Sequence, residues 1–178
     1  MSERSPDTFP LLLLHQAAVR GGEPSMREKD LGIWQSWTWS QVSEEVRALA
    51  CGLAELGFKR GDNLAIIGDN RPRLYWAMAA AQCLGGVPVP MYQDAVAQEL
   101  LFVLQDAEIK FAIVEDQEQT DKLLEVKDQC PQLAHILYDE PRGMRHYNQH
   151  FIHGLDEIQQ MGRTYMRNHP EFIDAEIA

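Results

Sequence analysis

The sequence predicts an α/β fold in which a mainly parallel sheet carries helices on both faces and is built from consecutive βα units. Four short apolar runs begin near Leu64, Val87, Phe111 and His135, and they are separated by 23, 24 and 24 residues. This spacing leaves room for one helix between successive strands, as parallel neighbours require. The runs LAII and FAIV show no polar alternation, which is typical of strands covered on both faces.

Composition limits the class of protein. The chain has 178 residues, of which 45% are hydrophobic and 24% charged, so one domain with a hydrophobic core is expected over residues 1–178. The formal charge of −11 argues against a nucleic-acid partner and against unaided docking on an anionic membrane. Membrane contact is therefore expected to be peripheral at most.

Cysteine usage and the apolar runs bear on the compartment. The three cysteines are widely spaced and form no CxxC pair, so neither a disulfide framework nor a zinc site is indicated. The run Leu11 to Leu14 is too short to span a bilayer, and the residues before it lack the flanks of a signal peptide. These observations favour a reducing, cytoplasmic location.

Residues 1–60 are expected to begin with a helix and a strand. The helix covers residues 9–20 with Thr8 as its cap, and a polar loop follows. Further on, Trp37 and Trp39 alternate with polar residues. A period of two indicates a short strand or one arm of a hairpin.

A second helix completes this region. Thr38 and Gln41 have the spacing of a capping box, and Gly57 is placed to end the helix in a left-handed turn. One apolar face runs through Val42, Val46, Leu49, Leu53 and Leu56.

Three helices are expected to alternate with the strands of residues 61–140. Asp94 is placed to cap the second of them, Glu118 and Lys122 form an exposed pair on the third, and Pro131 stops it. The predicted helices cover residues 72–84, 96–106 and 118–129.

Residues 141–178 break the regular repeat. The stretch DEPRGMRHYNQHF is polar and rich in turn formers, so a surface loop is expected there. A helix should follow over residues 155–168, before Pro170. The final EFIDAEIA alternates apolar and acidic residues without a cap, which favours a chain that is cut rather than finished.

The loop GDNRPR lies where an open α/β sheet would place a ligand, at the carboxyl end of the first strand. However, Asn70 and Arg71 replace the glycines of a phosphate-binding turn, and Pro72 opens the helix. We therefore expect a simple turn in which the proline holds Arg71 extended. A receiver-like or flavodoxin-like binding module, with Asp69 and Asp116 around a magnesium ion, is a weaker alternative because the acidic pair and the final lysine of a receiver are missing.

Histidine and cysteine side chains are candidate metal ligands and nucleophiles. His146, His150 and His153 have helical spacing, but nearby glycines interrupt a helix and no carboxylate completes a metal site. Solvated loop histidines are the better interpretation. Two of the cysteines, Cys51 and Cys83, fall on apolar helix faces and are expected to be buried.

Cys130 precedes a proline at a helix end, a position compatible with exposure, and has no activating base nearby. The motifs GxSxG, GxxxxGKS, GxGxxG and HExxH are all missing from the sequence. No catalytic, cofactor-binding or metal-binding residue is assigned.

The stretch WQSWTWSQVSEEVRALACGLAELGFKRGDNLAIIGDNRPRLYWAMAAAQCLGGVPVPMY resembles the opening region of the adenylate-forming acyl-CoA synthetases. The resemblance rests on the order of five segments: a strand ending in an aromatic residue, a helix closed by glycine, a GD turn, an N-R-P loop and a G-x-V-x-V-P strand. QELLFVLQDAEIKFAIVEDQEQTDKL matches the next segment, and ILYDEPRGMRHY is similar to the bacterial long-chain fatty-acid branch. One departure is PMYQD, where the family usually has P-L-Y-P-T.

The resemblance implies a ligase that joins a fatty acid to coenzyme A through an acyl-adenylate, using ATP and magnesium. Its triphosphate loop, magnesium ligand, ribose-binding carboxylates and mobile lysine have no counterpart in this sequence. The chain would therefore be a partial AMP-binding domain, a scaffold inactive alone, whose exposed apolar surface favours self-association. A third alternative is a regulatory partner that kept the front of a synthetase without its chemistry.

Overall fold

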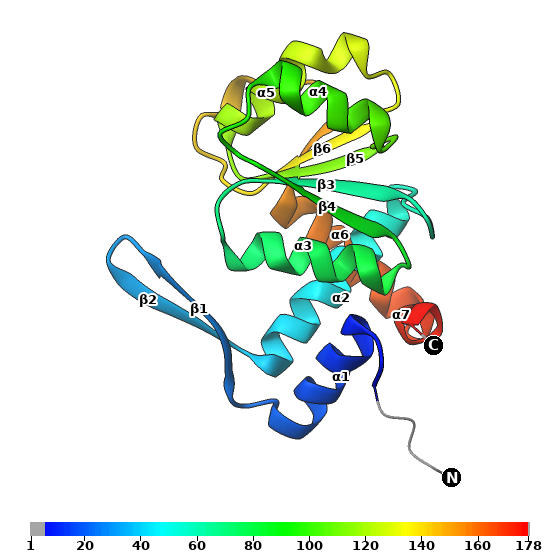
Figure 1. The fold of residues 1–178 in the computed structure, drawn as a ribbon. Helices are drawn as coiled ribbons and strands as arrows, with labels where there is room; N and C mark the ends of the chain where they lie inside the picture. Colours follow the sequence, from blue (N-terminus) through cyan, green and yellow to red (C-terminus); the bar gives the residue numbers. More distant parts are fainter. Residues whose placement is uncertain (1–5, 178) are drawn as a thin grey trace.

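Residues 6–177 are described by a computed structural model, drawn in Figure 1. Its main sheet has five strands in the spatial order β4-β3-β5-β6-β7, and every neighbouring pair is parallel. The strands are β3 (Asn63–Ile67), β4 (Val87–Met91), β5 (Phe111–Val114), β6 (His135–Tyr138) and β7 (Ile152–Gly154). The four apolar runs of the sequence are thus confirmed as parallel neighbours, whereas β7, with only three residues, was not predicted.

Helices cover both faces of this sheet, as Figure 1 shows. The side chains of β3 alternate between two cores: Leu64 and Ile66 face one, and Ala65 and Ile67 face the other. The first core is closed by α2 (Trp39–Glu55), α3 (Pro72–Cys83) and α6 (Leu155–Asn168). The second is closed by α4 (Ala97–Asp106) and α5 (Gln117–Val126). Burial on both sides explains why the strand sequences lack polar alternation.

The first two helices begin as the sequence predicts. Helix α1 (Phe9–Arg20) is capped by the Thr8 hydroxyl, which accepts a hydrogen bond from the Leu11 nitrogen at 3.4 Å. Helix α2 carries the predicted capping box: the Gln41 nitrogen donates to the Thr38 hydroxyl at 3.3 Å, and the Thr38 nitrogen donates to the Gln41 side chain at 2.9 Å. Gly57, with φ +97°, follows the end of this helix, so its predicted left-handed conformation is confirmed.

The segment predicted as a polar loop after α1 instead contains β1 (Pro24–Asp30), which pairs with β2 (Ile33–Thr38) in an antiparallel hairpin. This prediction was wrong because an exposed two-stranded ribbon does not need a continuous apolar face. Trp39 was expected to extend the strand, but it begins α2.

The cap predicted for α4 was also wrong. The N-cap residue is Val96 rather than Asp94, and the Glu99 carboxylate accepts a hydrogen bond from the Val96 nitrogen at 3.3 Å. In α5 the predicted pair is confirmed, with Lys122 Nζ 2.9 Å from the Glu118 carboxylate. A short 3-10 helix, η1 (Lys127–Gln129), continues α5 towards the proline that ends it.

After β6 the chain crosses the surface through a 3-10 turn, η2 (Met144–His146), before it reaches α6. The alternating segment at the carboxyl end forms a short helix, α7 (Phe172–Ile177), which was not predicted. It is fixed to α2 by an ion pair in which Arg47 lies 2.6 Å from Asp174. The segment therefore belongs to the packed structure of the described residues.

Strand β4 forms one margin of the sheet. Its Val87 nitrogen donates to the Asp62 carbonyl at 3.0 Å, so the amides of alternate residues point towards β3 and those of the intervening residues point outward. The intervening positions are Pro88 and Pro90, which have no N–H group. Prolines in strands are confined to such edges.

Candidate functional site: the carboxyl edge of the sheet

The loops that leave β3, β4, β5 and β6 meet at one edge of the sheet. The chain steps from β3 to β4 on one side and then to β5 on the other, so the strand order reverses around β3. In open α/β sheets such a switch point forms a crevice in which ligands bind. The order β4-β3-β5-β6-β7 has the same pattern as the flavodoxin-like order 2-1-3-4-5.

The crevice between β3 and β5 is filled by side chains of the protein. Glu115 accepts hydrogen bonds at 2.6 Å from both the Asp69 backbone nitrogen and Arg71 Nε. Arg71 Nη1 also lies 2.8 Å from Glu28 of the hairpin. These two carboxylates raise the pKa of the Arg71 guanidinium above its ordinary value, with Glu115 the larger cause. A charged network therefore occupies the place where a ligand would bind.

Gly68 lets the loop after β3 approach β5 closely. A Cβ atom at this position would lie 2.5 Å from the Glu115 Cβ and 2.7 Å from Leu74 Cδ1. The glycine thus serves side-chain packing. The Asp69 and Arg71 amides of this loop already donate to the Glu115 carboxylate and the Asp69 carbonyl, so they are not open to a phosphate. Arg71 has φ −103° and ψ 146°, which confirms the extended conformation predicted before the proline.

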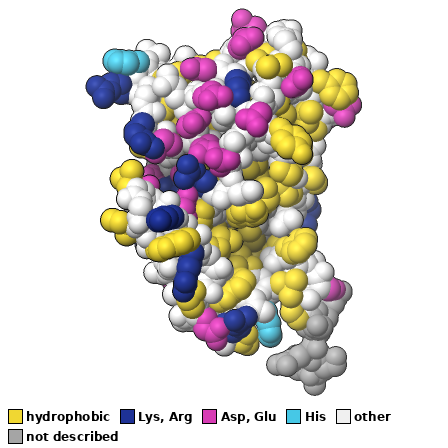
Figure 2. All heavy atoms as spheres, turned by 60° about the vertical axis from the view of Figure 1, so that its left-hand side comes forward, with side chains coloured by type: hydrophobic (Ala, Val, Ile, Leu, Met, Phe, Trp, Pro, Cys, Tyr) yellow, Lys and Arg dark blue, Asp and Glu magenta, His cyan; other side chains and the backbone are white. Residues whose placement is uncertain are grey.

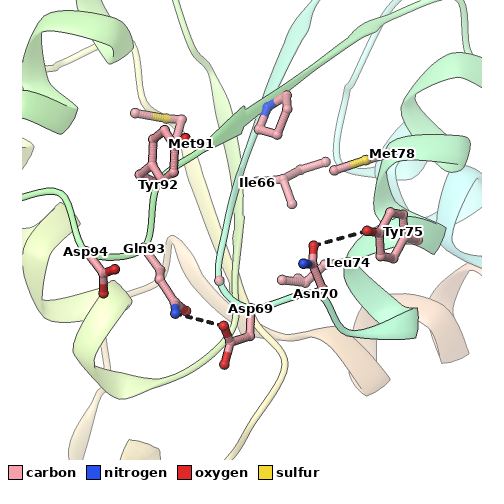
Figure 3. A pocket seen from close by; sticks show the side chains of 12 residues that line it. Ile66, Asp69, Asn70, Leu74, Tyr75, Met78, Met91, Tyr92, Gln93 and Asp94 are labelled. Atoms are coloured by element: carbon pink, nitrogen blue, oxygen red, sulfur yellow. Dashed lines mark hydrogen bonds between the residues drawn. The ribbon is translucent and has the colours of Figure 1, made fainter. Parts of the chain in front are cut away.

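Beside this network, a cavity of about 510 Å³ opens between α3 and the exit of β4. Its apolar floor and its polar rim appear in Figure 3. On the rim, Gln93 Nε2 donates to the Asp69 carboxylate at 2.7 Å, and the Tyr75 hydroxyl donates to Asn70 Oδ1 at 3.0 Å. The lining residues are Ile66, Gly68, Asp69, Asn70, Leu74, Tyr75, Met78, Pro90, Met91, Tyr92, Gln93 and Asp94.

The lining of this cavity contains two carboxylates and no lysine or arginine. A triphosphate would therefore meet negative charge without a cation to offset it. The lining also contains no serine, cysteine or histidine, so it holds none of the usual nucleophile and base pairs. This part of the edge can hold an apolar or hydroxyl-bearing group.

A second network joins the sheet edge to α6. Arg73 lies 2.8 Å from Asp139 after β6 and 2.6 Å from Asp156 at the start of α6. Its Nη2 also donates to the Gln159 side chain at 3.0 Å. Burial raises the pKa of the Asp139 carboxyl to about 6, and Arg73 only partly opposes this change. The arrangement fastens α3, β6 and α6 together.

The acidic pair considered for a receiver-like site has two separate roles. The Asp69 carboxylate accepts from Gln93. Asp116 caps α5, since its carboxylate accepts from the Gln119 nitrogen at 3.1 Å. Sequence reasoning missed Glu115 and Glu28, the partners of Arg71, because the first lies at the end of an apolar strand and the second in a segment not recognised as a strand.

The three histidines with helical spacing do not share a helix. His146 belongs to η2, His150 lies in an exposed turn and His153 lies in β7. His153 Nε2 instead stands 3.2 Å from His135 Nδ1, and the His135 ring stacks on Phe111 at a centroid distance of 4.9 Å. Within residues 6–177, no group of three or more histidine, cysteine or carboxylate side chains is arranged to hold a metal ion.

All three cysteines are buried and free. Burial raises the pKa of the Cys51 thiol to about 11 and that of Cys83 to about 12. Cys130, whose position was compatible with exposure, is fully buried, and burial also raises its pKa. Raised pKa values leave all three as thiols that pack as small apolar groups.

The parallel sheet, the helices on both faces and the switch point define a doubly wound α/β domain. Comparison with known proteins then gives the family. The family model described as AMP-binding enzyme matches residues 13–170, so the chain belongs to the AMP-binding enzyme family.

Individual relatives agree with this assignment. The long-chain-fatty-acid–CoA ligase ACSBG2 of Xenopus laevis is 33% identical over 132 residues, which are 74% of this chain and 18% of that protein. An uncharacterised protein of Mycobacterium tuberculosis, Rv1549, is 35% identical over 83 residues, which are 47% of both chains. An acetoacetyl-CoA synthetase from Streptomyces lividans superimposes with a TM-score of 0.75 at 21% identity, over 84% of this chain and 24% of that one. This last likeness shows the fold.

The chain spans about a fifth of the length of the ligase relative, 18% of ACSBG2. Among the residues that the structure describes, no helix is long and apolar enough to cross a membrane.

Proposed function

We propose that these residues act as the amino-terminal supporting part of an AMP-forming long-chain fatty-acid–CoA ligase. The match of the family model to residues 13–170 carries the proposal, and the name of the Xenopus relative supplies the substrate class. The reaction of the whole enzyme would join a fatty acid to coenzyme A at the expense of ATP. In that enzyme the two networks at the sheet edge would hold the fold rigid.

The described residues do not fit the triphosphate. The Arg71–Glu115 pair fills the switch point, and the neighbouring cavity presents carboxylates without a cation. ATP, magnesium and coenzyme A would therefore be bound by residues outside this chain, and we expect none of them to bind this chain alone. No catalytic step is assigned to its side chains.

Two measurements test the proposal. Calorimetric titration of the 178-residue chain with magnesium ATP should give no binding heat, and micromolar binding would contradict the scaffold role. The gene should then be sequenced past Ala178 and its complete product assayed for thioester formation with a long-chain fatty acid. An extended product that releases no pyrophosphate with any fatty acid would exclude the ligase.

A second candidate is a non-catalytic regulatory or binding module. The matched residues make up 47% of this chain and 47% of Rv1549, so the two sequences have similar lengths. A relative of this length is consistent with a short module. Within this class, a receiver-like or flavodoxin-like role is opposed by Asp116, which caps α5. A stop codon directly after Ala178, together with an inactive product, would favour the regulatory module.

The proposal includes self-association of the isolated chain. Large apolar side chains lie exposed beside the margin formed by β4, and they include Val87, Tyr92, Val96 and Phe102 at 52%, 86%, 59% and 69% exposure. In Figure 2 hydrophobic side chains gather along this side, which is hollowed in its middle part. In isolation we expect the chain to self-associate through this surface, in the cytoplasm and without a nucleic-acid partner. A concentration-independent monomer in sedimentation equilibrium would contradict the self-association.

A further inference from the structure

The hairpin of β1 and β2 stands out from the body of the protein, at the left in Figure 1, and its two faces differ in chemistry. One face packs inward, where Trp37 meets Trp76 edge-on at 5.6 Å and Glu28 pairs with Arg71. On the other face, Lys29 lies directly opposite Trp34 across the strands. Arg27, two residues before Lys29, lies on the same outward face.

The tip of the hairpin is apolar and exposed. Leu31, Ile33 and Trp34 expose 87%, 66% and 65% of their surface. Leu31 and Gly32 both have positive φ, 46° and 83°, as the two central residues of a type I′ turn require. Leucine is a poor residue for this conformation, which favours Asn, Asp or Gly. Leu31 is thus both exposed and in a backbone conformation that leucine disfavours.

The outward face is basic in a protein of net charge −11. Within residues 6–177, neither Arg27 nor Lys29 takes part in an ion pair, whereas the carboxylate between them, Glu28, is turned inward to Arg71. Figure 2 shows basic side chains interleaved with hydrophobic ones on the side where the hairpin comes forward. The outward face and the tip thus combine two cations, an exposed tryptophan and two aliphatic side chains. The exposed Asp30 carboxylate lies on the same side of β1 as Glu28, away from the two cations.

We propose that the outward face and tip of this hairpin dock on the surface of an anionic lipid bilayer. Exposed Trp and aliphatic side chains insert at the boundary between headgroups and acyl chains, while adjacent Lys and Arg side chains are attracted by anionic headgroups. The net negative charge of the body does not prevent this contact. At physiological ionic strength charges are screened over about 8 Å, and the hairpin projects from the body.

The size of the tip favours a membrane over a protein partner. A stable protein interface buries roughly 800 Å² on each side, and three side chains at the end of a two-stranded ribbon cannot supply that area. Insertion into a fluid bilayer needs no complementary pocket. The proposal concerns these side chains alone and does not depend on ligase activity.

Vesicle co-sedimentation of the full 178-residue chain tests the proposal. Vesicles of phosphatidylcholine mixed equally with phosphatidylglycerol should retain the chain, and pure phosphatidylcholine should retain much less of it. Arg27→Ala with Lys29→Ala should weaken binding by about fivefold for each cation removed. Trp34→Ser should weaken it further, and the tryptophan fluorescence quenched by brominated lipid in the wild type should lose its Trp34 contribution.

Phe9→Ser is the matched control, because Phe9 is 71% exposed but lies at the start of α1. It should bind vesicles as the wild type does. The proposal is overturned by no binding to the anionic vesicles, by equal binding to the neutral ones, or by an equal loss in Phe9→Ser. It is also overturned if Trp34→Ser only converts a dimer into a monomer, which would make the hairpin a contact between copies. Ile33→Ser provides a second tip variant should Trp34→Ser fold poorly.

Discussion

Gly162 of α6 lies backbone to backbone against Gly52 of α2: a Cβ atom added at Gly162 would stand 2.6 Å from the Gly52 nitrogen and would overlap the Ala48 carbonyl oxygen. A Cβ atom at Gly52 would in turn lie 2.7 Å from Ile158 Cγ2 and would overlap the carbonyl oxygen of the same residue. Helices α2 and α6 therefore approach as closely as their backbones allow, which fixes the position of α6 over the first core.

Gly162→Ala should destabilise the protein. Replacing a glycine in a helix interior by alanine ordinarily stabilises by about 1 kcal/mol, but here the added methyl group meets backbone atoms that cannot move aside. We expect a net loss of about 3 kcal/mol in the free energy of unfolding, measured by urea titration. Gly22→Ala is the control, because a Cβ atom at Gly22 has no neighbour within 4 Å. Equal stability of the two variants would refute the close approach of α2 and α6.

Arg71→Ala should loosen the sheet edge and the base of the hairpin together. Glu115, only 12% exposed, would keep its hydrogen bond from the Asp69 nitrogen but lose its cationic partner, and a buried carboxylate that is only partly satisfied costs about 1–3 kcal/mol. Hydrogen exchange should accelerate in β1 and in the loop after β3. Arg142→Ala removes an ion pair whose arginine is 80% exposed, so it should change stability by less than about 0.5 kcal/mol. Unchanged exchange in both variants would show that the Arg71 pairs stabilise nothing.

The raised pKa of the Asp139 carboxyl leads us to expect an unusual dependence of stability on pH. Its pKa is about 6 in the folded protein against an ordinary value of 3.8, so between these values the folded state binds more protons than the unfolded state. Its contribution to stability therefore decreases as pH rises from about 4 to about 6, by up to about 3 kcal/mol. Urea titrations of the wild type and Asp139→Asn across this window should diverge with rising pH. Parallel curves would mean that the Asp139 pKa is not raised.

The His135 and His153 pair acts in the opposite direction. Burial is the main cause that lowers both pKa values. His153 and then His150 lower the pKa of His135 further, whereas at His153 the pKa is raised by Glu157 and lowered by His150. The folded state thus favours neutral rings, so stability should be lost as pH falls below about 6.5.

His153→Gln should reduce this loss, and His15→Gln, in the exposed part of α1, should leave it unchanged. The comparison uses the difference between each variant and the wild type, because Asp139 changes stability over part of the same pH range. If His153→Gln loses as much stability at low pH as the wild type does, the histidine pair is not the cause of this loss.

Sequence periodicity predicted the strands and helices that bury a continuous apolar face. The spacing of Leu64, Val87, Phe111 and His135 was sufficient to predict parallel strands but not their order in the sheet, and Thr38 with Gln41 was sufficient for the start of α2. Prediction missed elements that are short or exposed: β1 is a charged ribbon strand, β7 has three residues and α7 has six. A segment of this kind shows no clear apolar periodicity.

The candidate site depended on contacts that span the sequence. Glu115 lies 44 residues from Arg71, and no spacing rule joins the two, since the strand order decides which loops meet. The burial of Cys130 likewise follows from packing against the second core, although its place before a proline is compatible with exposure. The absence of a phosphate fingerprint, in contrast, was evident from Asn70 and Arg71, because backbone access requires glycine at those positions.

Pro88 and Pro90 remove hydrogen-bond donors from the free margin of the sheet. Its carbonyl groups can accept hydrogen bonds, but at these two positions it has nothing to donate, so another polypeptide cannot complete a ladder along β4. Stacking into cross-β fibrils requires both directions of bonding. Copies of the chain can therefore meet through the apolar side chains beside this margin while β4 itself remains protected from amyloid growth.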